Sequence, residues 1–295
     1  MILLFVLFIL CSWPLKIAFG LLLGACVQIA SVVALMYIFP LGLLCLRKSR
    51  FATLLGRYLM RVNFEPESLE RLHNLDPNSR YVFACEPHGD KTLGMALTFG
   101  APGHNTLPDK VVSNCVVVAH WLLFFVPFVA QLFVLCGVVC SRPKHFLYRT
   151  LRLGCNFAVC PSGLKGKFAT LQRRDEDVPK SLTGKRIIQV VQRAQRLGFC
   201  SLAARYKAKI VPVLSLHEDV AYYHLFQSLR VPMLVCTVGS LVFFPICERL
   251  DVRVGMPIDT DGYNSENSGE MSMLAARYYK ALQDLAEPDY CVFLE

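Results

Sequence analysis

The residues best suited to chemistry lie in one short segment, Glu86, Pro87, His88, Gly89 and Asp90. A histidine with an ordinary pKa of about 6.5 can accept a hydroxyl proton at neutral pH. Glu86, two positions earlier, could hold the imidazole ring or stabilise its protonated form. The backbone N–H groups of Gly89 and Asp90 could receive an oxyanion. The segment therefore predicts a general base in a turn, and a purely structural turn histidine is the alternative.

The elements around this segment are expected to place it at the end of a strand. Residues 81–85 have the pattern of a buried strand, and Asp90 is a suitable N-cap for a helix over residues 91–99. Open α/β sheets carry their reactive groups outside the carboxyl ends of strands. We therefore expect His88 to lie at such an end, directly before a helix.

A second candidate site is the glycine turn that follows a strand expected at residues 156–160. Its backbone N–H groups and the two lysines that come next could bind phosphate groups. It does not match the Walker A pattern, and no G-x-S-x-G nucleophile elbow occurs in the chain. A surface turn with solvated lysines fits equally well. The residues concerned are Pro161, Ser162, Gly163, Lys165 and Lys167.

No metal centre or disulfide framework is expected. His217, Glu218 and Asp219 follow a strand-like segment, but adjacent side chains alternate faces, so a polar loop is the default interpretation. The 13 cysteines form no C-x-x-C pair. Buried, reduced thiols that act as small hydrophobic side chains are the simplest reading of them.

Composition divides the chain into two domains. Residues 1–46 contain one charge, Lys16, and as a helix they would span roughly 69 Å, about twice the thickness of the hydrocarbon core. This length predicts a membrane-embedded hairpin or anchor, with a cleaved signal peptide as the alternative. Arg47, Lys48 and Arg50 follow at once and place this flank on the cytosolic side. With 54% hydrophobic and 18% charged residues, an ordinary soluble enzyme is not expected.

Residues 47–295 alternate short apolar runs with helix-like stretches, which indicates an α/β domain. The net charge of +9 suits an anionic membrane surface or a phosphorylated substrate. Nucleic acid is not expected, because the basic residues are not interleaved with exposed aromatic residues. The expected helices cover residues 51–62, 145–153, 197–207 and 271–285, and further strands cover 111–118 and 210–216. The apolar residues 119–140 could form a further membrane span, but the valines before them favour a strand followed by a helix that dips into lipid.

The strand followed by Glu-Pro-His-Gly resembles the signature of the diacylglycerol acyltransferase 2 family, which has H-P-H-G or E-P-H in this place. That family includes monoacylglycerol and wax-alcohol acyltransferases. Later segments are similar to its R-x-G-F, V-P-x-x-S-F-G-E and V-G-x-P-I motifs, in the family's order. His217 stands where the family usually has glycine, and the turn at Ser162 lacks the acid of the family's G-G-x-x-E turn. The matching residues include Pro87, Arg196, Gly198, Phe199, Pro212 and Glu218.

This resemblance implies a mixed sheet flanked by helices, with a core like that of glycerolipid acyltransferases, and acyl-CoA-dependent O-acyltransferase activity. His88 would take the proton of a mono- or diacylglycerol hydroxyl as the oxygen attacks the thioester, yielding neutral lipid such as triacylglycerol. No bound cofactor is implied, because acyl-CoA is a co-substrate. The endoplasmic reticulum membrane, with the catalytic domain facing the cytosol, is the implied location, and lipid droplets are another. The candidate acyl-CoA-binding residues are Arg142, Lys144, Gly163, Lys165 and Lys167.

The partners that the resemblance implies are acyl-CoA, mono- or diacylglycerol and membrane lipid. It leaves open whether the protein forms a homo-oligomer. The alternatives are a lysophospholipid or wax-alcohol acyltransferase, or a non-catalytic lipid-binding membrane relative. The H-x-x-x-x-D motif of other glycerolipid acyltransferases is not matched, because Leu93 occupies the position of the acid.

Overall fold

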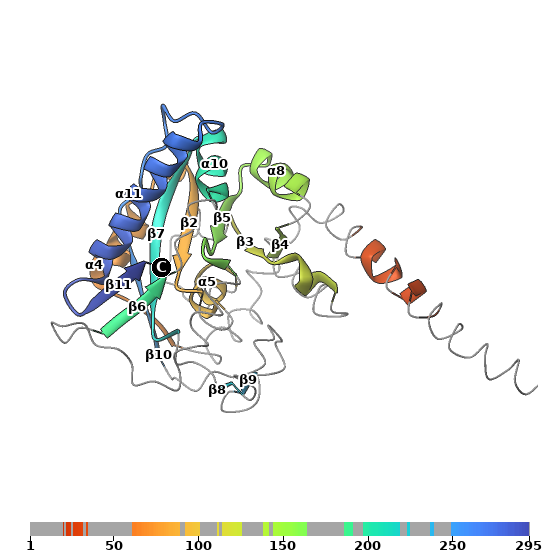
Figure 1. Ribbon diagram of the computed structural model, residues 1–295, viewed down its shortest axis with the longest axis horizontal. Coiled ribbons are helices and arrows are strands. Elements are labelled where there is room, and N and C mark those ends of the chain that lie inside the picture. The colour runs from red at the N-terminus through yellow and green to blue at the C-terminus, as the bar shows by residue number, and fades with distance from the viewer. Residues whose placement is uncertain are drawn as a thin grey trace, which may run out of the picture.

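A seven-stranded mixed sheet forms the centre of the protein, in the order β1-β10-β7-β2-β5-β3-β4 (Figure 1). The computed structural model describes residues 20–34 with gaps, 61–88, 92–100, 111, 114–125, 138–141, 144–163, 186–190, 197–218, 223–224, 237–238 and 249–294. The strands of this sheet are β1 (Arg61–Phe64), β2 (Arg80–Glu86), β3 (Cys115–Ala119), β4 (Val138–Cys140), β5 (Asn156–Val159), β7 (Ala208–Leu216) and β10 (Arg249–Val254). Two small sheets join β6 (Arg186–Val190) to β11 (Tyr290–Leu294) and β8 (Tyr223–His224) to β9 (Thr237–Val238).

Five neighbouring strands run in the same direction, which brings their carboxyl ends to one edge of the sheet. Strand β2 pairs in parallel with both β7 and β5, and β3 pairs in parallel with β5 and β4. Strand β10 is antiparallel to β7 and carries β1 beside it. β2 is central and buried along most of its length, and five of its seven residues are apolar. The expected α/β fold with a mixed sheet is confirmed.

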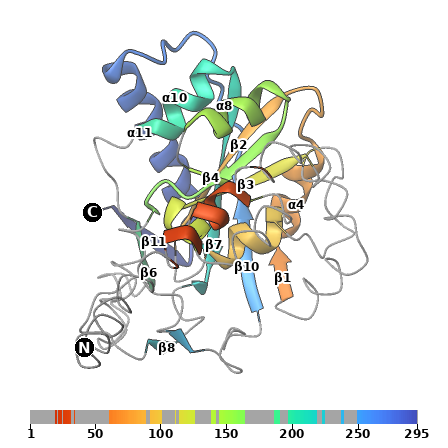
Figure 2. The same cartoon turned by 90° about the vertical axis from the view of Figure 1, so that its right-hand side faces the viewer.

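Helices cover both faces of this sheet (Figures 1 and 2). On one face, a single buried apolar cluster contains Leu72 of α4 (Pro66–His73), Met95 of α5 (Leu93–Met95) and Phe99 of the π-helical turn η1 (Ala96–Gly100). On the other, Phe199 of α10 (Gly198–Arg205) packs with Tyr278 of α11 (Ser268–Ala286). α8 (Lys144–Arg152) packs near α10 through a smaller apolar cluster. The sheet is therefore the middle layer of three.

Most of the expected elements are present within one to three residues of their predicted bounds. Three expectations need correction. Arg61 and Val62 belong to β1 and not to a helix, and the strand expected over residues 111–118 begins at Cys115. At the two described ends of the apolar stretch 119–140, a 3-10 turn, η2 (Trp121–Phe125), and the strand β4 replace the expected helix, and Val138 and Val139 of β4 pair with β3. Residues 126–137 lie outside the described part of the chain.

The expected membrane hairpin over residues 1–46 lies largely outside the described residues. The described residues between 20 and 34 are helical, and Leu22, Leu23 and Val27 among them are more than half exposed. Within the ranges given above, no helix is both long enough and apolar enough to cross a membrane.

Candidate active site

His88 lies where the sequence predicts it, immediately beyond the carboxyl end of β2. Pro87 is buried and His88 is half-buried, so the imidazole is at the boundary between the core and the surface. The carbonyl oxygen of His88 accepts the backbone N–H of Thr92 at 3.1 Å, directly before α5 begins at Leu93. A central strand end of a parallel sheet is the usual place for a reactive group. The position is thus confirmed, and the catalytic role stays a prediction.

The side chain of Glu86 faces the turn after β5. Its Oε1 accepts the backbone N–H of Ser162 at 2.6 Å, and its Oε2 accepts the Ser162 hydroxyl at 2.7 Å. Cys160 Sγ is a weaker donor to the same oxygen at 3.6 Å. Within the described part of the chain, the predicted contact between Glu86 and the ring of His88 is not among the hydrogen bonds of this carboxylate. Glu86 therefore connects the ends of β2 and β5.

Burial controls the ionisation of this cluster. It raises the pKa of Glu86 from 4.5 to about 7, and the hydrogen bonds from Ser162 oppose that rise. Burial, together with the nearby Glu86 charge, raises the pKa of the Cys160 thiol well above its usual range. The thiol consequently stays protonated, whereas Glu86 changes its charge near neutral pH.

This raised pKa predicts a pH-dependent stability. The folded protein holds a proton on Glu86 between pH 4.5 and about 7, where the unfolded chain has lost it. Stability from this group is therefore complete below pH 4.5 and falls as the pH rises through about 7. Relative to Glu86→Gln, the wild type should lose about 2 kcal/mol of unfolding free energy between about pH 5.5 and about pH 8.5. Urea unfolding of both proteins in detergent measures this, and equal pH slopes would contradict it.

The segment after His88 is also attached to the end of β7. Glu218 is buried, and its Oε1 accepts the backbone N–H of Gly94 at 3.2 Å. The hydroxyl of Ser215 is buried beside Gly94 and has no hydrogen-bond partner among the described residues. Gly94 approaches so closely that a Cβ atom there would lie 1.9 Å from Ser215 Oγ. This contact explains a glycine in the helix that follows His88.

Substitution Gly94→Ala should destabilise the fold by about 2 kcal/mol, because overpacking forces the helix and β7 apart. The added Cβ would also lie 2.7 Å from Ser215 Cβ, so only Ser215→Gly removes both clashes. We expect Ser215→Gly to recover part of the loss in a double-mutant cycle, and Ser215→Ala to recover less. The matched control is Gly198→Ala, which meets no described atom within 4 Å. Thermal unfolding curves that are equal for Gly94→Ala and the control would contradict this explanation.

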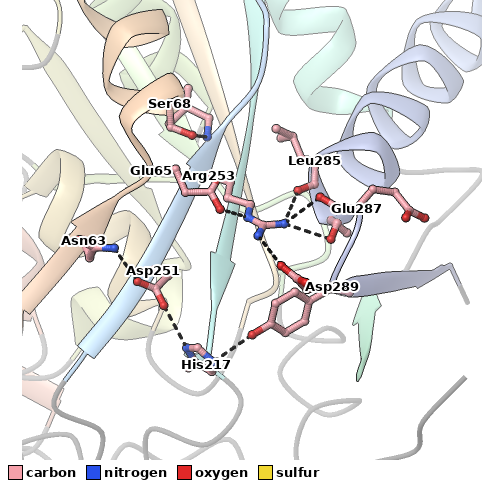
Figure 3. Close-up of polar contacts among 12 residues, drawn as sticks. Asn63, Glu65, Ser68, His217, Asp251, Arg253, Leu285, Glu287 and Asp289 are labelled. Carbon is pink, nitrogen blue, oxygen red and sulfur yellow. Dashed lines mark hydrogen bonds and ion pairs between the residues drawn. The ribbon is translucent and has the colours of Figure 1, made fainter. Parts of the chain in front are cut away.

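His217 connects the end of β7 to β10 and β11. Its φ of 69° lies in the left-handed region, where glycine is unstrained, so the backbone accounts for glycine as the usual residue of the similar family motif. Its Nδ1 is 3.7 Å from Asp251 Oδ2, and its Nε2 is 3.1 Å from the Tyr290 hydroxyl. Asp251 also accepts the side-chain amide of Asn63 at 2.8 Å (Figure 3). Within the described ranges, no three potential ligands converge as they would around a metal ion.

The other predicted site residues divide into four groups. Lys144 begins α8, shortly after the carboxyl end of β4, and Gly163 follows Ser162 with a left-handed φ of 56°. Phe199 and Pro212 are buried, and the ring of Phe199 packs on that of Tyr278 at 5.1 Å between centroids. Gly198 is the first residue of α10 and is exposed. Outside the described residues lie Gly89, Asp90, Arg142, Lys165, Lys167 and Arg196.

The sequence places Ser162 in a candidate turn and Ser215 in a motif, but it does not predict what either serine contacts. Ser162 is the partner of Glu86, and Ser215 is the close neighbour of Gly94. Ser215 is a polar residue in a mostly apolar strand, and this pattern could have indicated a specific buried contact. For the pairing of Ser162 with Glu86 there was no such signal, because 76 positions separate them.

The sequence of this chain is similar to those of known acyltransferases. Residues 26–233 match the family described as "Diacylglycerol acyltransferase". "Diacylglycerol O-acyltransferase 2" of Xenopus tropicalis is 24% identical over 246 residues, and that of Danio rerio is 22% identical over 249 residues. Each alignment covers 76% of this chain but 64% of the relative, so the chain spans less than two thirds of either relative.

Among solved structures, the 1-acyl-sn-glycerophosphate (LPA) acyltransferase PlsC of Thermotoga maritima aligns with a TM-score of 0.46 and 15% identity. The alignment covers 83% of this chain and 80% of that one. The family match is the stronger finding, because it extends over more than half of the sequence and includes both strand-end segments, at His88 and at Ser162. On this basis the chain belongs to the diacylglycerol acyltransferase family.

Proposed function

We propose that this protein is an acyl-CoA-dependent O-acyltransferase that esterifies mono- or diacylglycerol. The observation that carries the proposal is the half-buried His88 at the carboxyl end of the central strand β2, in a chain of this family. The two similar relatives are named for diacylglycerol acylation, which favours an acylglycerol as acceptor. Acyl-CoA is consumed as a co-substrate, and we expect no bound cofactor.

His88 is the general base in this mechanism. The imidazole takes the proton of the acceptor hydroxyl while the oxygen attacks the thioester carbonyl carbon. A C–O bond forms, the C–S bond breaks, and coenzyme A leaves as a thiolate that receives the proton from the imidazolium. Backbone N–H groups of Gly89 and Asp90 are expected to stabilise the oxyanion between these steps. The products are one ester and free coenzyme A.

The coenzyme A phosphates are expected to bind near the ends of β4 and β5. Both strands run parallel to β2, so residues that follow them come to the edge that carries His88. The sequence supplies Arg142 and Lys144 after β4, and Gly163, Lys165 and Lys167 after β5. Positive charges at this edge would favour the phosphate groups of the donor.

We also propose that residues 1–46 anchor the protein in the endoplasmic reticulum membrane, with residues 47–295 on the cytosolic face. The single charge in this segment and the basic residues after it support that orientation. The exposed Leu22, Leu23 and Val27 give its helical part an apolar surface that suits lipid. Alkaline carbonate extraction should leave the protein in the membrane, and protease added from the cytosolic side should digest residues 47–295. Complete release by carbonate would contradict the anchor.

The decisive experiment is an acylation assay on washed membranes that contain the full chain. Labelled oleoyl-CoA is incubated with monoacylglycerol, diacylglycerol, a long-chain alcohol or lysophosphatidic acid, and the products are separated. Label in di- or triacylglycerol supports the proposal. Label only in wax ester or phospholipid would assign one of the other acceptors, and no product with any acceptor would favour a lipid-binding relative without activity.

A further inference from the structure

The carboxylate of Glu86 connects β2 to the turn after β5, beyond the point where the backbones of these two strands stop pairing. Backbone pairing between β2 and β5 ends at Ala84 and Val159, whereas pairing between β2 and β7 continues to Glu86. The last residues of β2 are therefore held by β7 and not by the β5 backbone. The turn that contains Ser162 begins in this interval. Side-chain contacts must therefore set the position of this turn against β2.

Glu86 provides these contacts with both of its oxygens. Each oxygen accepts one donor of the same residue, the N–H and the hydroxyl of Ser162, at 2.6 and 2.7 Å. Both residues are buried, Glu86 fully and Ser162 with 1% of its surface exposed. Two short hydrogen bonds to one residue fix its direction as well as its distance. Gly163, which comes next with a left-handed φ, is oriented as a consequence.

We propose that Glu86 is a positioning residue. Its hydrogen bonds to Ser162, here called the latch, hold the turn at Ser162 against the His88 end of β2 and thereby set the affinity for acyl-CoA. The inference rests on the proposed function. It differs from a direct role in proton transfer, because the Glu86 carboxylate contacts Ser162 and Cys160. The latch should therefore act on the binding of the donor more than on the chemical step.

The test measures the affinity of the full chain in lipid nanodiscs for coenzyme A and for oleoyl-CoA. Ser162→Ala removes the hydroxyl bond and keeps the N–H bond, and Glu86→Ala removes both. We expect the dissociation constants to rise about tenfold for Glu86→Ala and less for Ser162→Ala. Glu86→Gln keeps an acceptor for the Ser162 N–H and should bind more tightly than Glu86→Ala. The double variant should bind no more weakly than Glu86→Ala, because the hydrogen bond between Glu86 and the Ser162 hydroxyl is already lost in that variant.

Ser68→Ala is the matched control. Ser68 is also a buried serine, and its hydroxyl accepts the backbone N–H of Val254 at 2.9 Å, but it belongs to α4. This variant should lose stability while keeping the affinity for coenzyme A. Thermal unfolding of every variant identifies any that do not fold. If Glu86→Ala is among them, Glu86→Gln and Ser162→Ala decide the outcome.

Steady-state kinetics separate the latch from a direct catalytic role. The latch predicts a higher KM for oleoyl-CoA, with kcat changed less than about threefold. A large fall in kcat at unchanged KM would overturn it, as would additive effects of the two substitutions or an equal effect of Ser68→Ala. If the wild type binds coenzyme A but forms no ester, the proposed function fails and the affinities alone judge the latch. If the wild type binds neither ligand, both are overturned.

Discussion

Replacement of His88 by alanine is expected to lower acyl transfer from oleoyl-CoA by about 10²- to 10⁴-fold, the usual contribution of a general base. His88 is half-buried at the end of β2, and its backbone carbonyl accepts the N–H of Thr92. The substitution therefore removes the base while this backbone hydrogen bond stays. Membrane association and the unfolding temperature should stay close to those of the wild type. Initial rates on washed membranes, normalised to protein, measure the effect.

His73→Ala is the control for this experiment, because His73 is an exposed histidine at the end of α4. It should keep the wild-type rate. Addition of imidazole to His88→Ala should restore part of the activity if the missing group is a base and not a structural contact. A rate above about one tenth of the wild type, without imidazole, would remove His88 from the mechanism.

The strand ends were predictable from sequence because their signals are local. The apolar run before Glu86 fills a whole buried strand, and the following proline and glycine indicate a turn. The same reasoning located the strand before Ser162 and the strand that contains Pro212. A parallel α/β sheet then brings these ends to a common edge, whatever the details of packing. The general position of the candidate site follows from these facts alone.

The contacts that shape the site were not predictable in this way. Glu86 and Ser162 are 76 positions apart, and Gly94 and Glu218 are 124 apart, so no periodicity connects them. Sequence reasoning assigned Glu86 to the nearest histidine, because the two are neighbours in the chain. In the fold, the strand directs its carboxylate to the turn after β5. Which neighbour a buried polar side chain contacts depends on strand order, and that is a tertiary property.

The second large effect expected is on stability, at Arg253 of β10 (Figure 3). Its guanidinium is buried, and Nη1 donates to the carbonyl oxygens of Leu285, Ala286 and Glu287 at 2.9, 3.0 and 3.2 Å. These carbonyls end α11 and have no further helical turn to bond them. Nε also donates to Glu65 Oε1 at 2.6 Å, at the start of α4. One side chain thus joins β10 to helices that cover both faces of the sheet.

Arg253→Met, which keeps the apolar stem, should therefore cost about 4 kcal/mol of unfolding free energy, since it removes the ion pair with Glu65 and the hydrogen bonds to the end of α11, including the one to the carbonyl of the buried Ala286. Arg253→Lys should recover little, because one ammonium cannot reproduce the planar set of donors. The control is Arg277→Met on the exposed side of α11, where the guanidinium contacts the Tyr263 hydroxyl. Urea unfolding in detergent provides the free energies. A loss below about 1 kcal/mol for Arg253→Met would mean that water replaces these donors, and that the end of α11 holds to the sheet by apolar packing alone.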